Sequence, residues 1–226
     1  MASTALRPIL EVSHLGVIGY DAATRLMEER VDVCFAGAPD ALYLLEHLPV
    51  YTLGRGADPR YAEGAWASDV PVVRSGRGGQ VTYHGPGQLV AYPVVDLRRH
   101  GCDVGAYVGR LEAVVIRTLE TWGIAGRREP GHPGVWVGDR KIASIGIAVR
   151  RWIAWHGLAL NVGPEIAPFE RIVPCGIAGL RMTAVALEGG PDSVAAVAAP
   201  LARVFAAEFG HDAVESRASA PAEARP

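Results

Sequence analysis

One cysteine in this chain has neighbours that could present its sulfur to a substrate. Cys175 lies in the stretch IVPCGIAG, between Pro174 and Gly176, at the end of a short apolar run. The proline and the glycine favour a turn, and we expect the amide of Gly176 to be free to approach a developing oxyanion. A cysteine without such context is more often a small buried residue. Its setting therefore makes Cys175 a candidate nucleophile.

The other two cysteines lack a comparable setting. Cys34 falls on the apolar stripe of a helix expected after Asp21, and Cys102 lies in the charged stretch RRHGCD. The three cysteines form no CxxC pair, which argues against a zinc knuckle and against a disulfide framework. We interpret Cys34 as a packing residue and Cys102 as a loop thiol, and we predict no metal and no cofactor.

Lys141 is the second candidate, because it opens an apolar strand. Strand alternation would place it on the face of four apolar residues, Ala143, Ile145, Ile147 and Val149. Burial disfavours the charged form of an amine, so a buried Lys141 could be neutral and serve as a base. From the local sequence alone, a frayed strand end with Lys141 reaching water is an equally good reading.

The stretch RGGQVTYHGPGQ, residues 77–88, repeats glycine more than a turn requires. Repeated glycine indicates that backbone must approach something closely. His84 lies inside this stretch and is expected to line a site, whereas His156, in AWHGLALNV, is more typical of a hydrogen-bonded structural residue. The sequence has no GxxxxGK[ST] loop, GxSxG elbow or HExxH pair, so these nucleotide, serine-hydrolase and zinc-protease signatures are excluded.

The hydrophobic pattern predicts elements of both kinds. Two strand-like runs are expected in ALYLLEHLPVYTLGRG, a buried strand over 89–97, and three further strands in VWVGDRKIASIGIAV and WIAWHGLALNV. Helices are expected after Asp21, after Asp103 to near Gly123, and over 193–209, with Pro200 bending or dividing the last. These runs predict an α/β (α+β) fold with a mixed, largely antiparallel sheet flanked by helices.

Length and charge limit the remaining possibilities. The 226 residues are 50% hydrophobic, so residues 1–213 are expected to form one domain, followed by a disordered tail over 214–226. The net charge of −2 gives no general attraction to nucleic acid or to an anionic membrane. No apolar run is long enough to span a bilayer, and no signal peptide pattern opens the chain. We expect a cytoplasmic protein that binds neither nucleic acid nor a membrane.

Four ordered motifs together resemble the octanoyltransferase, or lipoyl(octanoyl) transferase, family of protein lipoylation. They are RGGQVTYHGPGQ at 77–88, KIASIG at 141–146, HGLALNV at 156–162 and IVPCGI at 172–177. The resemblance extends over roughly residues 44–177. It implies the fold of biotin and lipoate protein ligases, with a sheet around a narrow acyl tunnel.

The resemblance also implies a reaction and its residues. An octanoyl group would leave octanoyl-acyl carrier protein, rest on Cys175 as a thioester, and pass to a lysine ε-amine on lipoyl domains of 2-oxoacid dehydrogenase complexes or the glycine cleavage H protein. Lys141 matches the lysine that activates the cysteine. The matched substrate-binding positions are Arg77, Gly78, Gly79, Gln80, Val81, Thr82, Tyr83, His84, Ser144, Ile145, Gly146, Gly157, Leu158 and Ala159.

Two other functions stay open at this stage. A lipoate or biotin ligase of the same fold would bind ATP and would not need Cys175, while a noncatalytic acyl-binding module would use the glycine-rich stretch as a pocket. An acidic carrier protein would need a basic patch, and three arginine pairs could supply one. Of these we favour Arg150 with Arg151, because they end the strand of Lys141 and are expected to lie close to the site.

Overall fold

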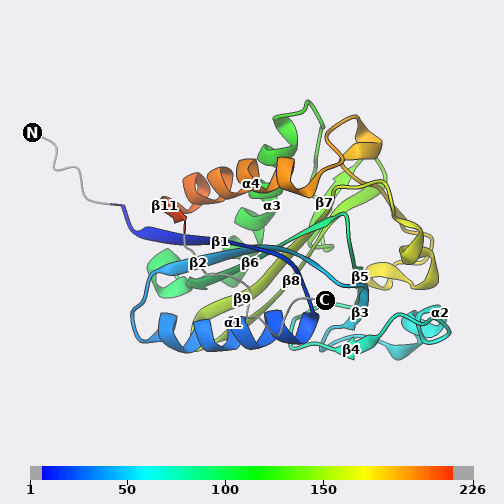
Figure 1. The fold of residues 1–226 in the computed structure, drawn as a ribbon, viewed down its shortest axis with the longest axis horizontal. Coiled ribbons are helices and arrows are strands. Elements are labelled where there is room, and N and C mark those ends of the chain that lie inside the picture. Colours follow the sequence, from blue (N-terminus) through cyan, green and yellow to red (C-terminus); the bar gives the residue numbers. More distant parts are fainter. Residues whose placement is uncertain (1–6, 216–226) are drawn as a thin grey trace, which may run out of the picture.

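Strands from both halves of the chain join in one mixed sheet in the computed structural model, which describes residues 7–215 (Figure 1). Its strand order is β10-β8-β9-β6-β2-β1-β11, and β7 pairs with the other edge of β8. The strands are β1 (Ile9–Ile18), β2 (Asp40–His47), β6 (Gln88–Asp96), β7 (Gly134–Val137), β8 (Arg140–Arg150), β9 (Ile153–Asn161), β10 (Arg181–Met182) and β11 (Asp212–Glu215). The pairs of β1 with β2 and β11, and of β8 with β10, are parallel, and the others are antiparallel.

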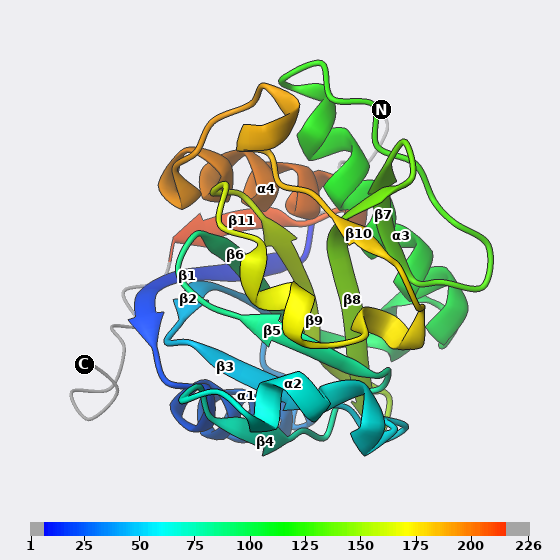
Figure 2. The ribbon, with the colours of Figure 1, turned by 90° about the vertical axis from the view of Figure 1, so that its right-hand side faces the viewer.

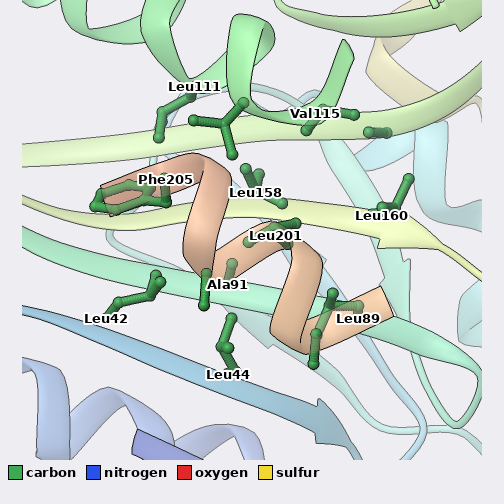
Figure 3. Packing of buried hydrophobic residues seen from close by; sticks show 14 of the residues in the cluster. Leu42, Leu44, Leu89, Ala91, Leu111, Val115, Leu158, Leu160, Leu201 and Phe205 are labelled. Atoms are coloured by element: carbon green, nitrogen blue, oxygen red, sulfur yellow. The ribbon is translucent and has the colours of Figure 1, made fainter. Parts of the chain in front are cut away.

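Helices cover both faces of this sheet. Helix α1 (Tyr20–Phe35) packs on one face, and α3 (Val104–Glu120) and α4 (Val194–Phe209) pack on the other (Figure 1). Strand alternation explains the division. Leu42, Leu89 and Leu160 pack with α3 and α4, while their sequence neighbours Tyr43, Val90 and Ala159 pack with α1. Figure 3 shows Leu42, Leu44, Leu89 and Leu160 on the face of α3 and α4.

A small second sheet stands beside the large one and carries the glycine-rich stretch (Figure 2). It has the order β4-β3-β5, with β3 at Val50–Leu53, β4 at Val72–Arg74 and β5 at Val81–His84. The short helix α2 (Glu63–Trp66) packs with this unit, together with 3-10 turns at Pro59–Ala62 and Ala167–Arg171. Residues 81–84 of the glycine-rich stretch therefore form a strand.

Most of the expected elements are confirmed, and several boundaries differ. Asp103 caps α3 by accepting a hydrogen bond from the Ala106 amide at 2.9 Å, and Pro200 lies within α4 without dividing it. Strand β1 had no counterpart among the expected elements. Strand β11 includes Val214 and Glu215, so the structured chain passes the expected boundary at residue 213, and the rest of the expected tail lies outside the described residues.

Candidate active site

Cys175 lies in a strained turn between β9 and β10. Its φ of 59° and ψ of 9° are left-handed, a conformation that costs a non-glycine residue free energy and often marks a functional site. The turn covers Pro174–Gly176, and the amide of Val173 donates to the Tyr61 carbonyl at 2.8 Å, which anchors it. The sulfur-bearing residue is partly exposed. The expectation for Gly176 is wrong, because its amide already donates to the Val173 carbonyl at 3.1 Å.

The amine of Lys141 meets this sulfur. Lys141 Nζ donates to Cys175 Sγ at 2.9 Å and to the Pro133 carbonyl at 2.9 Å, and it lies 4.5 Å from the centre of the Trp136 ring. The lysine is 1% exposed, so the reading in which it reaches water is excluded. No carboxylate of residues 7–215 pairs with it. The thiol or thiolate of Cys175 is thus the group best placed to exchange a proton with this amine.

A bulge accounts for the direction of the Lys141 side chain. The register of β7 on β8 shifts between Val135 and Trp136, and both Ile142 and Ala143 join the apolar core under α3. Simple alternation is therefore broken next to Lys141, which corrects the expectation that it shares the apolar face. β-Bulges often redirect a side chain beside an active site. Gly134 leaves space for the Lys141 side chain, because a Cβ at position 134 would lie 2.6 Å from Lys141 Cε.

The dyad opens into a cavity of about 290 Å³ between the glycine-rich stretch and strands β8 and β9. Every position expected to bind substrate lines this cavity except Tyr83. Alternation along β5 explains the exception, since Thr82 and His84 face the cavity while Tyr83 packs on the far side against Tyr51 and Phe169. The structure thus brings residues from four separate motifs to one cavity.

The cavity wall also contains residues that the motifs did not indicate. They are Tyr92, Val108, Gly131, His132, Pro133 and Ile147. Pro133 acts through its carbonyl, which any residue type would supply, so no sequence pattern could have marked it. The others come from the edge of helix α3, a connecting segment and buried strands, where the sequence shows only ordinary apolar or loop residues.

The glycines of the stretch at 77–80 allow backbone to pack on backbone. The Gly78 amide donates to the Ile147 carbonyl at 2.8 Å, and a Cβ on Gly146 would lie 3.0 Å from the Gly78 oxygen. A Cβ on Gly54 would lie 2.3 Å from the Gly79 oxygen, closer than any real contact. This close approach holds the loop against β8 and leaves room for the cavity beside it.

Arg77 fixes the same loop from within. Its guanidinium donates to the Thr52 carbonyl at 2.7 Å, to the Thr52 hydroxyl at 2.6 Å, and to the carbonyls of Gly78 and Gln80 at 3.0 Å each. Burial lowers the pKa of Arg77 from its ordinary value. These bonds link β3 to residues 78–80, so Arg77 fixes the backbone of this part of the cavity wall.

Two histidines near the cavity are kept neutral by burial. Burial lowers the pKa of His84 well below its ordinary value and that of His156 to about 3. His84 lines the cavity, whereas His156 stacks on Trp155 with a ring-centre separation of 4.3 Å. The expectation that His156 is hydrogen-bonded is wrong, because neither of its buried ring nitrogens has a partner among residues 7–215. Neither histidine can serve as an acid of ordinary strength at neutral pH.

Arg150 and Arg151 lie far from the dyad, so the expectation that they are close to the site is wrong. Lys141 and Arg150 are at opposite ends of β8, and nine strand steps at roughly 3.3 Å each separate them by about 30 Å. Arg150 pairs with Asp32 at 2.7 Å, and the Arg151 guanidinium lies 5.0 Å from the Phe35 ring centre. This pair contacts the end of α1 and not the cavity.

Comparison with known proteins identifies the family. Residues 20–206 match the model of the lipoyl protein ligase A/B catalytic domain. The chain is 48% identical over 178 residues to an octanoyltransferase of Geobacter sp. (strain M21), covering 79% of this chain and 86% of that protein. It is 44% identical over 209 residues to an octanoyltransferase of Xanthomonas euvesicatoria pv. vesicatoria (strain 85-10), covering 92% and 89%.

The chain belongs to the octanoyltransferase family. Members of this family are acyltransferases of protein lipoylation. The fold is shared more widely, since lipoate-protein ligase A bound with ATP aligns with a TM-score of 0.72 at 17% identity, covering 96% of this chain and 91% of that one. No helix within residues 7–215 is long and apolar enough to cross a membrane.

Proposed function

We propose that this chain transfers an octanoyl group from octanoyl-acyl carrier protein to a lysine ε-amine on lipoyl domains, through a thioester on Cys175. The observation that carries the proposal is the 2.9 Å contact between Lys141 Nζ and Cys175 Sγ in the wall of a largely apolar cavity. Because a thioester donor is already activated, the reaction needs no nucleotide. The lipoyl domains are those of 2-oxoacid dehydrogenase complexes and the glycine cleavage H protein.

In the first half of the reaction the amine of Lys141 takes the thiol proton of Cys175. The thiolate attacks the thioester carbonyl, and collapse of the tetrahedral intermediate breaks the bond to the carrier's sulfur. The Lys141 ammonium returns its proton to that departing thiolate. The octanoyl group is then bound to Cys175, the carrier leaves as a free thiol, and Lys141 is a neutral amine.

In the second half a neutral lysine ε-amine of the lipoyl domain attacks the thioester on Cys175. Lys141 accepts the proton that the new carbon–nitrogen bond releases, and the carbon–sulfur bond breaks. The products are the amide and a thiolate–ammonium pair of Cys175 and Lys141. Transfer of one proton from Lys141 back to Cys175 restores the starting thiol and amine. The carrier leaves before the acceptor reacts, so the kinetics are ping-pong.

Two features favour this function over its alternatives. A ligase that makes an acyl-adenylate has no use for a cysteine in a strained turn against a buried amine, and a binding module has none either. Compared by its surroundings, Cys34 is a poor nucleophile, because it is buried on α1 with no amine of residues 7–215 beside it and burial raises the pKa of its thiol to about 12. The dyad is the feature that an acyl-enzyme mechanism requires.

The test is incubation with octanoyl-acyl carrier protein and a lipoyl domain in the absence of ATP, followed by intact-mass analysis of the lipoyl domain. We expect the domain to gain one octanoyl group with wild type and none with Cys175→Ala. Transfer that needs free octanoate and ATP would indicate a ligase instead. A bound but untransferred acyl group would indicate a binding module.

A further inference from the structure

The buried end of the cavity presents a hydrogen-bond acceptor that has no partner. His84 lines the cavity and is 5% exposed, and its Nε2 atom has no hydrogen-bond partner among residues 7–215. A buried polar atom without a partner costs free energy, so a donor from within the cavity would be stabilised there. The surrounding hydrogen bonds decide which kind of group that donor must be.

Those hydrogen bonds fix the tautomer of His84. The Asn161 amide nitrogen donates to the Thr183 carbonyl at 2.9 Å, so the Asn161 oxygen faces Gln88 and accepts from its amide nitrogen at 2.9 Å. The Gln88 oxygen is then the atom that contacts His84 Nδ1 at 2.7 Å. Nδ1 must therefore carry the proton, and Nε2 of this neutral ring offers a free lone pair.

The hydroxyl of Tyr92, which also lines the cavity, cannot fill that role. His47 Nδ1 contacts the Ile18 carbonyl at 3.0 Å and so carries the proton of that ring. His47 Nε2 therefore accepts from the Tyr92 hydroxyl at 2.9 Å, which uses the proton of Tyr92. The donor for His84 Nε2 has to come from whatever occupies the cavity.

The cavity wall between Gln80 and His84 is about as long as a medium acyl chain. A Cβ on Gly176 would lie 3.4 Å from Gln80 Cγ, so Gln80 lies beside the nucleophile's turn. Four strand steps lead from Gln80 to His84, about 13 Å at roughly 3.3 Å each. An extended eight-carbon chain spans roughly 9 Å, given carbon–carbon bonds of about 1.5 Å. One hydrogen bond of about 2.8 Å bridges most of the remainder.

We propose that His84 Nε2 accepts a hydrogen bond from the end of the acyl chain. The enzyme would then also transfer eight-carbon chains with a hydroxyl group on the terminal carbon. This inference rests on the proposed function. The hydroxyl would donate to Nε2, and the transfer chemistry at Cys175 would be unchanged. A hydroxyl on carbon 6 would lie two carbons short of the end of an extended chain, too far from Nε2 for a hydrogen bond.

The test compares three small thioesters of N-acetylcysteamine as donors: octanoyl, 8-hydroxyoctanoyl and 6-hydroxyoctanoyl. With wild type we expect kcat/KM for the 8-hydroxy chain to equal or exceed that for octanoyl, and kcat/KM for the 6-hydroxy chain to be at least tenfold lower. In His84→Leu the ratio of 8-hydroxyoctanoyl to octanoyl should fall at least tenfold. Because this is a ratio within one preparation, a partial loss of folded enzyme does not affect it.

Equal rejection of both hydroxylated chains by wild type would overturn the inference, as would an unchanged ratio in His84→Leu. If His84→Leu does not fold, the two hydroxyl positions compared on wild type decide the matter. If the wild-type protein does not transfer octanoyl at all, the proposed function is wrong. In that event calorimetric binding of the free 8-hydroxy and 6-hydroxy acids still tests the cavity, with tighter binding of the 8-hydroxy acid expected and equal binding contradicting it.

Discussion

Replacing Lys141 with methionine should separate the chemistry of the dyad from its packing. Methionine keeps a side chain of similar length beside Trp136 but has neither the charge nor the donor that reaches Cys175 Sγ at 2.9 Å. The residue is 1% exposed and lacks a carboxylate partner within residues 7–215, so its removal leaves no buried anion behind. The free energy of unfolding should therefore stay within about 1 kcal/mol of wild type or rise.

Activity should respond very differently. A positioned base contributes about 10²- to 10⁴-fold, which corresponds to roughly 2.7–5.4 kcal/mol of barrier at about 1.36 kcal/mol per tenfold. The assay is octanoyl transfer to a lipoyl domain, together with the rate of Cys175 alkylation against pH, whose rise should move to higher pH in Lys141→Met. Arg140→Met, which removes a neighbouring β8 cation paired with Glu188 at 2.9 Å, is the matched control. Transfer by Lys141→Met within tenfold of wild type, with an unchanged alkylation profile, would refute the reasoning.

Three further outcomes follow from the geometry. Cys34→Ala and Cys102→Ala should each retain octanoyl transfer within a fewfold of wild type, and loss of transfer without loss of folding would contradict the assignment of the nucleophile. Gly134→Ala should lower octanoyl transfer at least tenfold, because the new Cβ would lie 2.6 Å from Lys141 Cε. An unchanged kcat would contradict the claim that the position of the Lys141 amine is fixed. Burial lowers the pKa of His47 to about 4, so its contribution to the free energy of unfolding is complete above about pH 6.5 and is lost as pH falls toward 4, by up to about 3 kcal/mol. His84 and His156 have lowered pKa values as well, so all three should contribute to a decline in stability between pH 7 and pH 5, measured by urea unfolding. The decline should be smaller in His47→Gln, and an equal decline would contradict the assignment.

The sequence could predict the elements that carry strong periodicity and the motifs that carry chemistry. Helix α3 and strands β6 to β9 follow from apolar spacing, and the Asp103 cap follows from residue type alone. Strand β1 was missed, although Leu10 and Val12 alternate with Glu11 and Ser13. Its pairing with β2 and β11, parallel to both, depends on segments far apart in sequence.

The site could be predicted as a set of residues but not as a geometry. Alternation alone would have placed Lys141 in the apolar core, and the bulge that redirects it depends on the register of β7, which local sequence does not specify. The Pro133 carbonyl contact is a backbone interaction that no side-chain pattern reports. The prediction for Arg150 failed for a different reason. Two residues at opposite ends of one extended strand are far apart in space, even though they belong to the same element.

The central claim is that Cys175 carries the octanoyl group between two half-reactions. The most direct measurement is intact-mass analysis, with peptide mapping, of wild-type protein mixed with octanoyl-acyl carrier protein and no acceptor. The mechanism predicts one added octanoyl group on the peptide that contains Cys175, labile to hydroxylamine and released when a lipoyl domain is added. Octanoyl transfer to the lipoyl domain at full rate by Cys175→Ala, with no acylated protein detected in wild type, would contradict it.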